Sequence, residues 1–124
     1  MSASRLALRA ALAALATLAV LAAGCAFRRT PPPGASGALI YDYQNCANCH
    51  GDADEGQSLG PPLRDLGRHW TRDALAAFLA DPDGHAERDP RLAELEERYA
   101  GNMQPYDNLT LEQRLVLADW LLGL

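Results

Sequence analysis

The densest group of reactive side chains in this sequence is the run Cys46-Ala47-Asn48-Cys49-His50. Two thiols three residues apart, followed directly by an imidazole, form the attachment motif of a c-type haem. Each thiol can add across one vinyl group of the same porphyrin, and the imidazole that follows can bind the iron as an axial ligand. The spacing therefore predicts one covalent haem c, held by Cys46, Cys49 and His50.

Two other chemistries use paired cysteines. A thioredoxin-like redox pair would lie beside a βαβ pattern, and the sequence contains no alternating strand of useful length. A structural zinc site needs four ligands. The residues that could complete such a site are Cys25, His69 and His85, and the two histidines have the wrong spacing for a zinc finger. Haem attachment explains the motif better than either alternative.

The first 24 residues differ in composition from the rest of the chain. Arg5 and Arg9 precede an almost unbroken Ala/Leu run over residues 10–23, and no acidic residue occurs among them. This pattern predicts a signal peptide over residues 1–24 and export to the periplasm or another extracytoplasmic face. A transmembrane helix needs about 20 apolar residues. An uncleaved membrane anchor stays an alternative, because residues 6–8 could lengthen the run.

The apolar run ends in Leu21-Ala22-Ala23-Gly24-Cys25, which resembles the lipobox of bacterial lipoproteins. The resemblance implies cleavage before Cys25, attachment of a diacylglyceryl group to its sulfur, and a lipid anchor in a membrane. Ala22 stands where that family prefers Leu. The alternative is an ordinary secretory signal that leaves Cys25 as a free thiol. Lipidation is favoured because a lone exposed cysteine is a liability in an oxidising compartment.

Residues 25–37 are expected to form the lipidated cysteine and a Pro-rich tether. The Pro31-Pro32-Pro33 run favours extended polyproline II, which would hold the domain roughly 20–30 Å from a membrane. Without Arg5 and Arg9, 9 of the 11 basic residues remain against 16 acidic residues, and none is lysine. This acidic balance argues against nucleic-acid binding and favours protein partners.

The remaining residues, 38–124, carry only helical signals. Caps and apolar spacing predict four helices, over residues 38–45, 71–80, 89–101 and 110–122. In the last helix the predicted core stripe consists of Leu111, Leu115, Ala118 and Leu122. The domain is therefore expected to be all-α. Four short helices make a thin core, so the fold is expected to need its haem.

Residues 37–124 resemble the class I cytochrome c family. The resemblance rests on the attachment motif, on Gly60-Pro61-Pro62-Leu63, and on Met103 in a loop before the last helix. It implies a small all-α fold of about four short helices wrapped around one haem, with residues 38–124 as the cytochrome c domain.

The resemblance also implies roles for single residues. The carbonyl of Pro61 would accept the proton of the haem-ligating His50, which fixes the tautomer of the imidazole. Leu63 would pack on the haem face, and the sulfur of Met103 would be the second axial ligand. Gln104 departs from the family pattern, in which proline often follows that methionine. The alternative iron ligands are His69 and His85.

The sequence leaves the roles of two further sets of residues undecided. In the family the first and last helices cross at a small residue and an aromatic, and the candidates here are Gly37 or Ala38 and Tyr41 or Tyr43. Side chains after the Gly-Pro segment donate to haem propionates in relatives. The candidates for that role are Arg64, Arg68 and Trp70, and the alternatives are a solvated surface for the arginines and core packing for the tryptophan.

A His50/Met103 pair would leave no open position on the iron. The expected function is therefore a membrane-tethered, monohaem electron carrier between respiratory or dehydrogenase complexes, with redox proteins as partners. No small-molecule substrate and no enzymatic activity are expected. The alternatives are a haem subunit of a larger oxidoreductase, or a haem enzyme or sensor with a displaceable sixth ligand.

Overall fold

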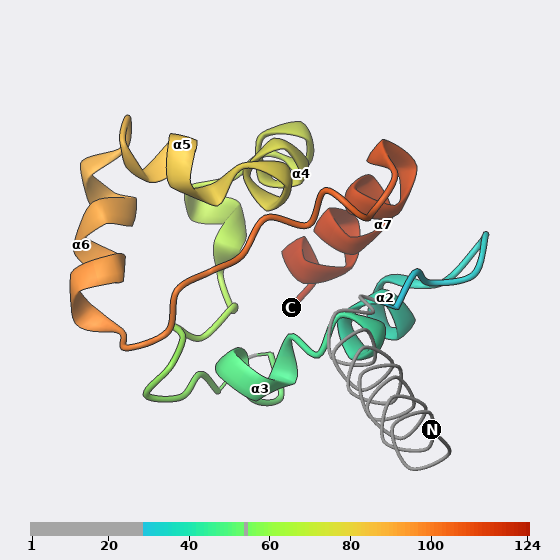
Figure 1. The fold of residues 1–124 in the computed structure, drawn as a ribbon, viewed down its shortest axis with the longest axis horizontal. Coiled ribbons are helices and arrows are strands. Elements are labelled where there is room, and N and C mark those ends of the chain that lie inside the picture. Colours follow the sequence, from blue (N-terminus) through green and yellow to red (C-terminus); the bar gives the residue numbers. More distant parts are fainter. Residues whose placement is uncertain (1–28, 54) are drawn as a thin grey trace, which may run out of the picture.

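The computed structural model describes residues 29–53 and 55–124. The predicted signal peptide and Cys25 lie outside these residues. Helices and no strand occur in the described part, which confirms the all-α prediction (Figure 1). None of the described helices is long and apolar enough to cross a membrane. The elements are α2 (Gly37–Tyr43), α3 (Ala47–His50), the 3-10 helix η1 (Leu66–Arg68), α4 (Arg72–Ala80), α5 (Pro82–Ala86), α6 (Pro90–Arg98) and α7 (Leu111–Leu122).

Local capping signals set where three of the long helices begin. The side chains of Thr71, Asp89 and Thr110 each accept a hydrogen bond from a backbone N–H in the first turn of the following helix. Gln113 completes a capping box, because its side-chain oxygen accepts from the backbone N–H of Thr110 at 3.1 Å. These caps satisfy donors that a helix start leaves without partners, and all of them were predicted.

The prediction of a polar loop after α4 is wrong, because a short helix, α5, follows α4. Asp81 ends α4 and also caps α5, since its carboxylate accepts from the backbone N–H of Gly84 at 3.1 Å. Pro82 stands at the first position of α5, where its missing N–H costs nothing. His85, which was placed in a polar loop, therefore lies in a helix. Its ring forms a T-shaped pair with that of Phe78, with 5.8 Å between ring centroids.

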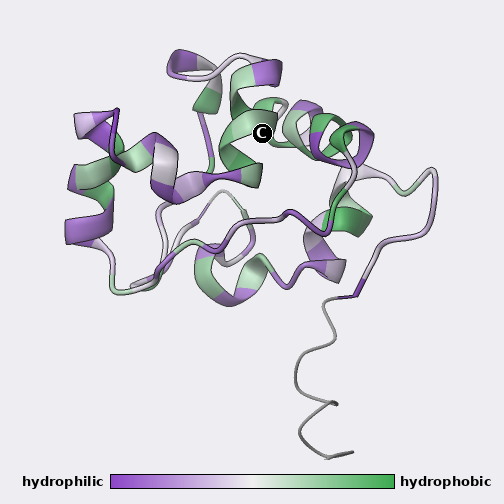
Figure 2. Ribbon diagram, turned by 45° about the horizontal axis from the view of Figure 1, so that its top comes forward, coloured by the Kyte–Doolittle hydropathy of each residue, from purple (hydrophilic) through white to green (hydrophobic). Residues whose placement is uncertain are grey.

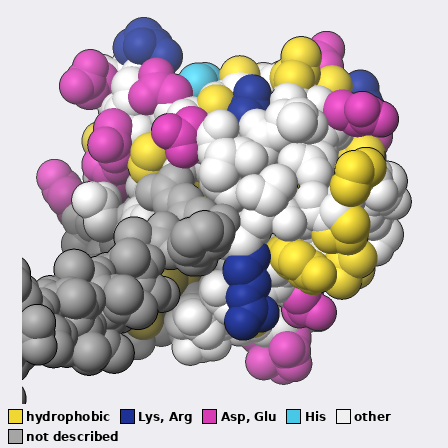
Figure 3. Space-filling model, turned by 45° about the vertical axis from the view of Figure 1, so that its right-hand side comes forward, with side chains coloured by type: hydrophobic (Ala, Val, Ile, Leu, Met, Phe, Trp, Pro, Cys, Tyr) yellow, Lys and Arg dark blue, Asp and Glu magenta, His cyan; other side chains and the backbone are white. Residues whose placement is uncertain are grey.

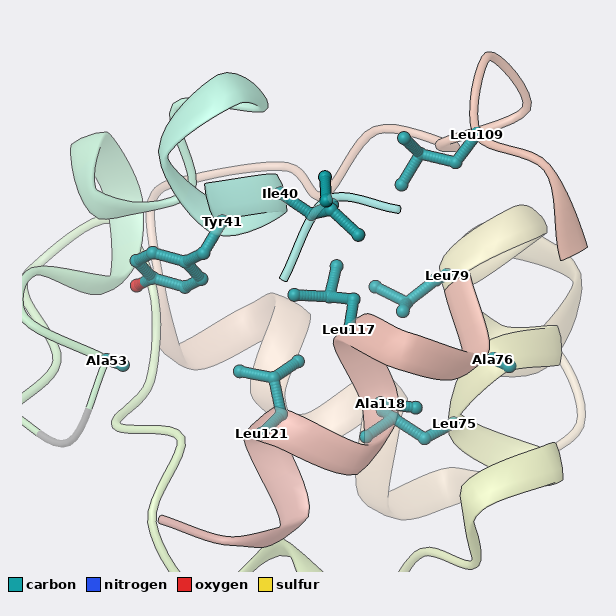
Figure 4. Packing of buried hydrophobic residues seen from close by; sticks show 11 residues of the cluster. Ile40, Tyr41, Ala53, Leu75, Ala76, Leu79, Leu109, Leu117, Ala118 and Leu121 are labelled. Carbon is teal, nitrogen blue, oxygen red and sulfur yellow. The ribbon is translucent and has the colours of Figure 1, made fainter. Parts of the chain in front are cut away.

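The core forms where α7 packs against both α2 and α4 (Figure 4). Ala76 of α4 and Ala118 of α7 are both fully buried, and small side chains there let the two helices approach closely. The buried face of α7 consists of Leu117, Ala118 and Leu121. This buried face differs from the predicted core stripe, because Leu111 of that stripe is 60% exposed. α7 has neighbours on two sides, so its apolar surface is broader than one stripe.

The structure shows which of the candidate residues lie at the crossing of α2 and α7. A Cβ atom on Gly37 would lie 2.2 Å from the Cβ of Trp120, so no larger residue fits at that position. Tyr41 is buried, and its ring centroid lies 5.2 Å from that of Trp120. Gly37 and Tyr41 are therefore the contact residues.

The segment before α2 belongs to the folded unit. The side chain of Pro31 is fully buried, and its carbonyl accepts a hydrogen bond from the Gln113 side chain at 3.1 Å. The carbonyl of Arg29 accepts from the Gln44 side chain at 2.8 Å. Within the segment predicted as a tether, Pro31 and Ala35 are therefore buried on the domain, whereas residues 32–34 are exposed.

α6 stands apart from this core (Figure 1). It packs mainly against α5 and makes no extensive contact with α2, α4 or α7. α6 carries strongly hydrophilic stretches, whereas α7 is mostly hydrophobic (Figure 2). The helix ends at Arg98, not at the predicted Gly101. Residues of α6 line one side of a cavity, and this cavity is the candidate functional site.

Candidate haem site

A cavity of about 1080 Å³ lies between the core helices, α3 and α6. Pockets that hold small molecules and cofactors usually measure about 300–1,000 Å³, so this cavity is large enough for a bulky planar group. All of the predicted site residues of the domain line it, namely Cys46, Cys49, His50, Pro61, Leu63 and Met103. The fold therefore brings together residues that are spread over 58 positions of the sequence, from 46 to 103.

The turn between α2 and α3 positions the attachment motif. Asn45 has a φ of 55°, a left-handed conformation that asparagine tolerates better than most residues. After this turn the backbone N–H of His50 donates to the carbonyl of Cys46 at 3.0 Å. This helical turn places Cys46, Cys49 and His50 at positions i, i+3 and i+4, which share one helix face. That face lines the cavity.

The imidazole of His50 is oriented by the Gly-Pro segment. Its Nδ1–H donates to the carbonyl of Pro61 at 2.8 Å, which is the hydrogen bond that the family resemblance implies. This bond leaves Nε2 as the free, metal-binding nitrogen. Burial lowers the pKa of His50, although the Pro61 carbonyl opposes that shift. The neutral imidazole, the form that binds iron, is therefore favoured at the cavity wall.

Two glycines let the loop after α3 approach the histidine. A Cβ atom on Gly60 would lie 3.0 Å from Nδ1 of His50 and 3.0 Å from the carbonyl oxygen of Cys49. Gly56 has a φ of 72°, and a Cβ there would lie 2.5 Å from the nitrogen of Pro62. The chain therefore needs glycine at both positions to hold the Pro61 carbonyl over the imidazole.

The Met103 loop is attached to the same segment. The backbone N–H of Ala100 donates to the carbonyl of Ser58 at 3.2 Å. A Cβ on Gly101 would lie only 2.1 Å from the carbonyl oxygen of Leu59, so the two loops are in backbone contact. Sequence reasoning missed Gly101, although its place two residues before Met103 was a usable signal. This contact brings the half-buried Met103 to the cavity.

The two alternative histidine ligands lie in less suitable places. His69 lines the cavity, but its side chain is exposed to solvent. His85 does not line the cavity, and its Nδ1 lies 2.7 Å from the carbonyl of Asp81, the N-cap residue of the same helix. Met103 is therefore the better candidate for the second ligand.

The thiol of Cys46 is unsuited to thiolate redox chemistry. Burial raises the pKa of Cys46 to about 11, although a hydrogen bond with the Tyr106 side chain opposes that shift. Redox-active cysteines need a lowered pKa, because the thiolate is the nucleophile. This argues against the thioredoxin-like alternative. Tyr106 was not predicted, and its position three residues after Met103 was the available signal.

The far wall of the cavity carries a cation that sequence reasoning also missed. The guanidinium of Arg91 lies 5.2 Å from the ring centroid of Trp70, and it pairs with Asp89 at 3.1 Å. Arg91, Trp70 and Arg64 line the cavity, whereas Arg68 does not. The apolar face of α6 lies beside Arg91 and consists of Leu92, Leu95 and Tyr99, which also line the cavity.

A family model described as Cytochrome c matches residues 34–124. No curated protein matches the chain. No solved structure matches it either. The matched range begins before α2, in agreement with the packing of the segment that precedes this helix.

Proposed function

This chain belongs to the cytochrome c family, whose function is haem-based electron transfer, and on that premise we propose that it is a membrane-tethered carrier of single electrons with one haem c. The observation that carries the proposal is the cavity wall itself. Cys46, Cys49 and His50 share one face of α3, and Met103 reaches the same cavity from another loop.

The residues at the cavity suit a closed electron-transfer site. When bound, haem supplies an iron that changes reversibly between the ferrous and ferric states. His50 offers Nε2 because Pro61 holds the proton on Nδ1. Met103 offers a neutral thioether, a ligand that favours the ferrous state. With both residues bound to the iron, no position would remain for a substrate, and Leu63 would contribute apolar surface to the cavity wall.

Export and lipidation at Cys25 complete the proposal. The signal-like residues 1–24 and the lipobox-like segment support it, and both lie outside the described residues. Because the segment from Arg29 packs on the domain, only four peptide units separate it from Cys25. Four extended residues span at most about 14 Å. The anchor would therefore hold the domain close to the membrane and raise the effective concentration of membrane-bound partners.

The covalent attachment has a direct test with a matched control. In the double variant Cys46→Ala/Cys49→Ala, we expect haem staining on a denaturing gel to disappear. In Cys25→Ala, we expect the haem to stay and the mass of the lipid to be lost, as measured by intact mass spectrometry. Haem staining that survives in the double variant would overturn the haem proposal. A Cys25→Ala protein whose mass differs from that of the unmodified protein only by the lost sulfur atom would overturn the lipid anchor alone.

The sixth ligand separates a carrier from a haem enzyme or sensor. We expect a sulfur-to-iron charge-transfer band in the spectrum of the oxidised protein, and its loss in Met103→Ala. If the band is missing and the reduced protein binds carbon monoxide rapidly, Met103 is not a firm ligand and the carrier proposal is wrong. Purification from membranes tests the third possibility, because a stable stoichiometric companion would indicate a fixed subunit of a larger complex.

A further inference from the structure

A second, shallow hollow shares Tyr41 with the haem cavity. It measures about 470 Å³ and lies where the end of α2, the start of α3 and the end of α7 meet. Its described lining residues are Ala38, Tyr41, Asp42, Ala47, Asp52, Ala53, Trp120 and Leu124. Neither the sequence motifs nor the haem site accounts for this hollow.

The lining combines apolar surface with negative charge. The rings of Tyr41 and Trp120 are in contact, and the three alanines add further apolar surface beside them. Asp42 and Asp52 are exposed, and neither makes a side-chain ion pair among those that the structure records. Both carboxylates line the hollow together with the Tyr41 ring. Burial is the main reason why the pKa of the Tyr41 hydroxyl is raised, and the charges of Asp52 and Asp42 add to it.

Such a hollow fits the end of a long cationic side chain. The methylene groups of a lysine or arginine can lie on apolar surface while the charged head stays at a polar edge. Aromatic rings attract cations further. Among the described residues that line the hollow, none is basic. The described part of the hollow therefore contains two carboxylates and no cation, and the carboxylates can bind a cation of a partner.

We propose that this hollow receives a lysine or arginine side chain of a basic redox partner protein. This inference rests on the proposed function. The net charge of −5 for the chain and its lack of lysine favour a partner of opposite charge. On the face shown in Figure 3, hydrophobic side chains reach the surface near acidic ones, and basic side chains occur on the same face. Because Tyr41 lines both the hollow and the haem cavity, its ring would lie between the docked side chain and that cavity.

The test is a titration of the haem-loaded, reduced protein with a hexalysine peptide, followed by NMR. We expect saturable shifts of the Trp120 indole N–H and of the Ala47 and Ala53 amides. In the variant Asp42→Asn/Asp52→Asn, we expect the dissociation constant to rise at least about five-fold, because both carboxylates that hold the cation are lost.

The control variant is Glu97→Gln/Glu112→Gln. It changes the net charge by the same amount, and both side chains are exposed and lie outside the hollow. We expect the control to bind hexalysine nearly as tightly as the unmodified protein. Equal weakening in the two variants would mean attraction by overall charge and would overturn the proposal. Shifts confined to residues outside the hollow would overturn it as well.

Two other results are informative. If the same signals shift with protein concentration in the absence of peptide, a second copy of the chain occupies the hollow and the basic-partner proposal is wrong. A protein isolated without haem would contradict the proposed function before any titration. A haem-loaded protein that shows no saturable binding would contradict only the proposal for the hollow, so the two failures are distinguishable.

Discussion

Two regions of this domain bury their apolar side chains in different ways. In the helical core, made of α2, α4 and α7, side chains such as Ile40, Ala76 and Ala118 belong to one packed cluster and are fully buried. In the cavity wall, made of α3, α6 and the loops 56–63 and 99–106, the apolar residues line the 1080 Å³ cavity. The core is complete within the chain, whereas the wall is completed by what fills the cavity.

This difference has an energetic consequence. Side chains that line empty space lose the dispersion contacts that stabilise a packed core. α6 is the clearest case, because its apolar face is directed to the cavity and its main helical neighbour is the five-residue α5. The need for haem, which was expected of the whole fold, is therefore narrowed to one part of it. We expect the helical core to fold without haem, and α6 to become stable only when haem fills the cavity.

The largest expected effect compares one aliphatic residue from each region. Ile40→Ala should lower the free energy of unfolding by about 3 kcal/mol with or without haem, because Ile40 is fully buried away from the cavity and its loss leaves a void in the core. Leu92→Ala should cost about 2 kcal/mol in the haem protein and close to zero in the haem-free Cys46→Ala/Cys49→Ala background. Urea unfolding measures both. Equal costs for Leu92→Ala in the two backgrounds would contradict the division into core and wall.

Hydrogen exchange tests the same division without changing a core residue. In the haem-free background, the amides of α6 should lose about 100-fold in protection, since regions with few buried contacts open locally. The amides of α4 and α7 should keep most of their protection. If protection falls evenly over all the helices, the domain unfolds as one unit and the core does not fold alone.

The contact between α2 and α7 gives a smaller effect. Gly37→Ala should cost about 2 kcal/mol of stability, because its new methyl group would overlap Trp120 and force the helices apart. Gly67→Ala is the control, since a Cβ there meets nothing within 4 Å. Thermal unfolding measures the two variants side by side. A Gly37→Ala protein as stable as the control would show that the helix crossing is less close than described.

The smallest expected effect is a pH dependence at the border of the two regions. Burial, with smaller contributions from nearby negative charges, raises the pKa of Tyr41 to about 12, and its hydroxyl donates to the carbonyl of Gly51 at 2.9 Å. The folded state therefore favours the protonated phenol. This stabilisation is complete below pH 10 and is lost as the pH rises from 10 to 12.

The variant Tyr41→Phe isolates that contribution. It should cost about 1 kcal/mol at neutral pH, the usual value of a lost hydrogen bond. The unmodified protein should lose more stability than Tyr41→Phe between pH 10 and pH 12 in urea unfolding experiments. Tyr43→Phe serves as the control on the same helix. Parallel pH profiles for Tyr41→Phe and the unmodified protein would show that Tyr41 is not the group that titrates.

Features that depend on neighbours in the sequence were predicted well. The caps at Thr71, Asp89 and Thr110 use hydrogen bonds within a few residues, so the sequence alone specifies them. α5 was missed because Pro82 was interpreted only as the end of a helix, although proline also suits the first position of the next one.

The sequence by itself determined the chemistry of the attachment motif. One helical turn places Cys46, Cys49 and His50 on a common face, and that geometry is local. Only the tertiary structure decided which partners meet across long separations in the chain. In the tertiary structure Pro31 is buried on the domain, and Gly37 and Tyr41 contact α7. The guanidinium of Arg91 lies over the ring of Trp70. Such contacts depend on the shape and volume of surfaces far apart in the chain, which hydrophobic periodicity does not encode.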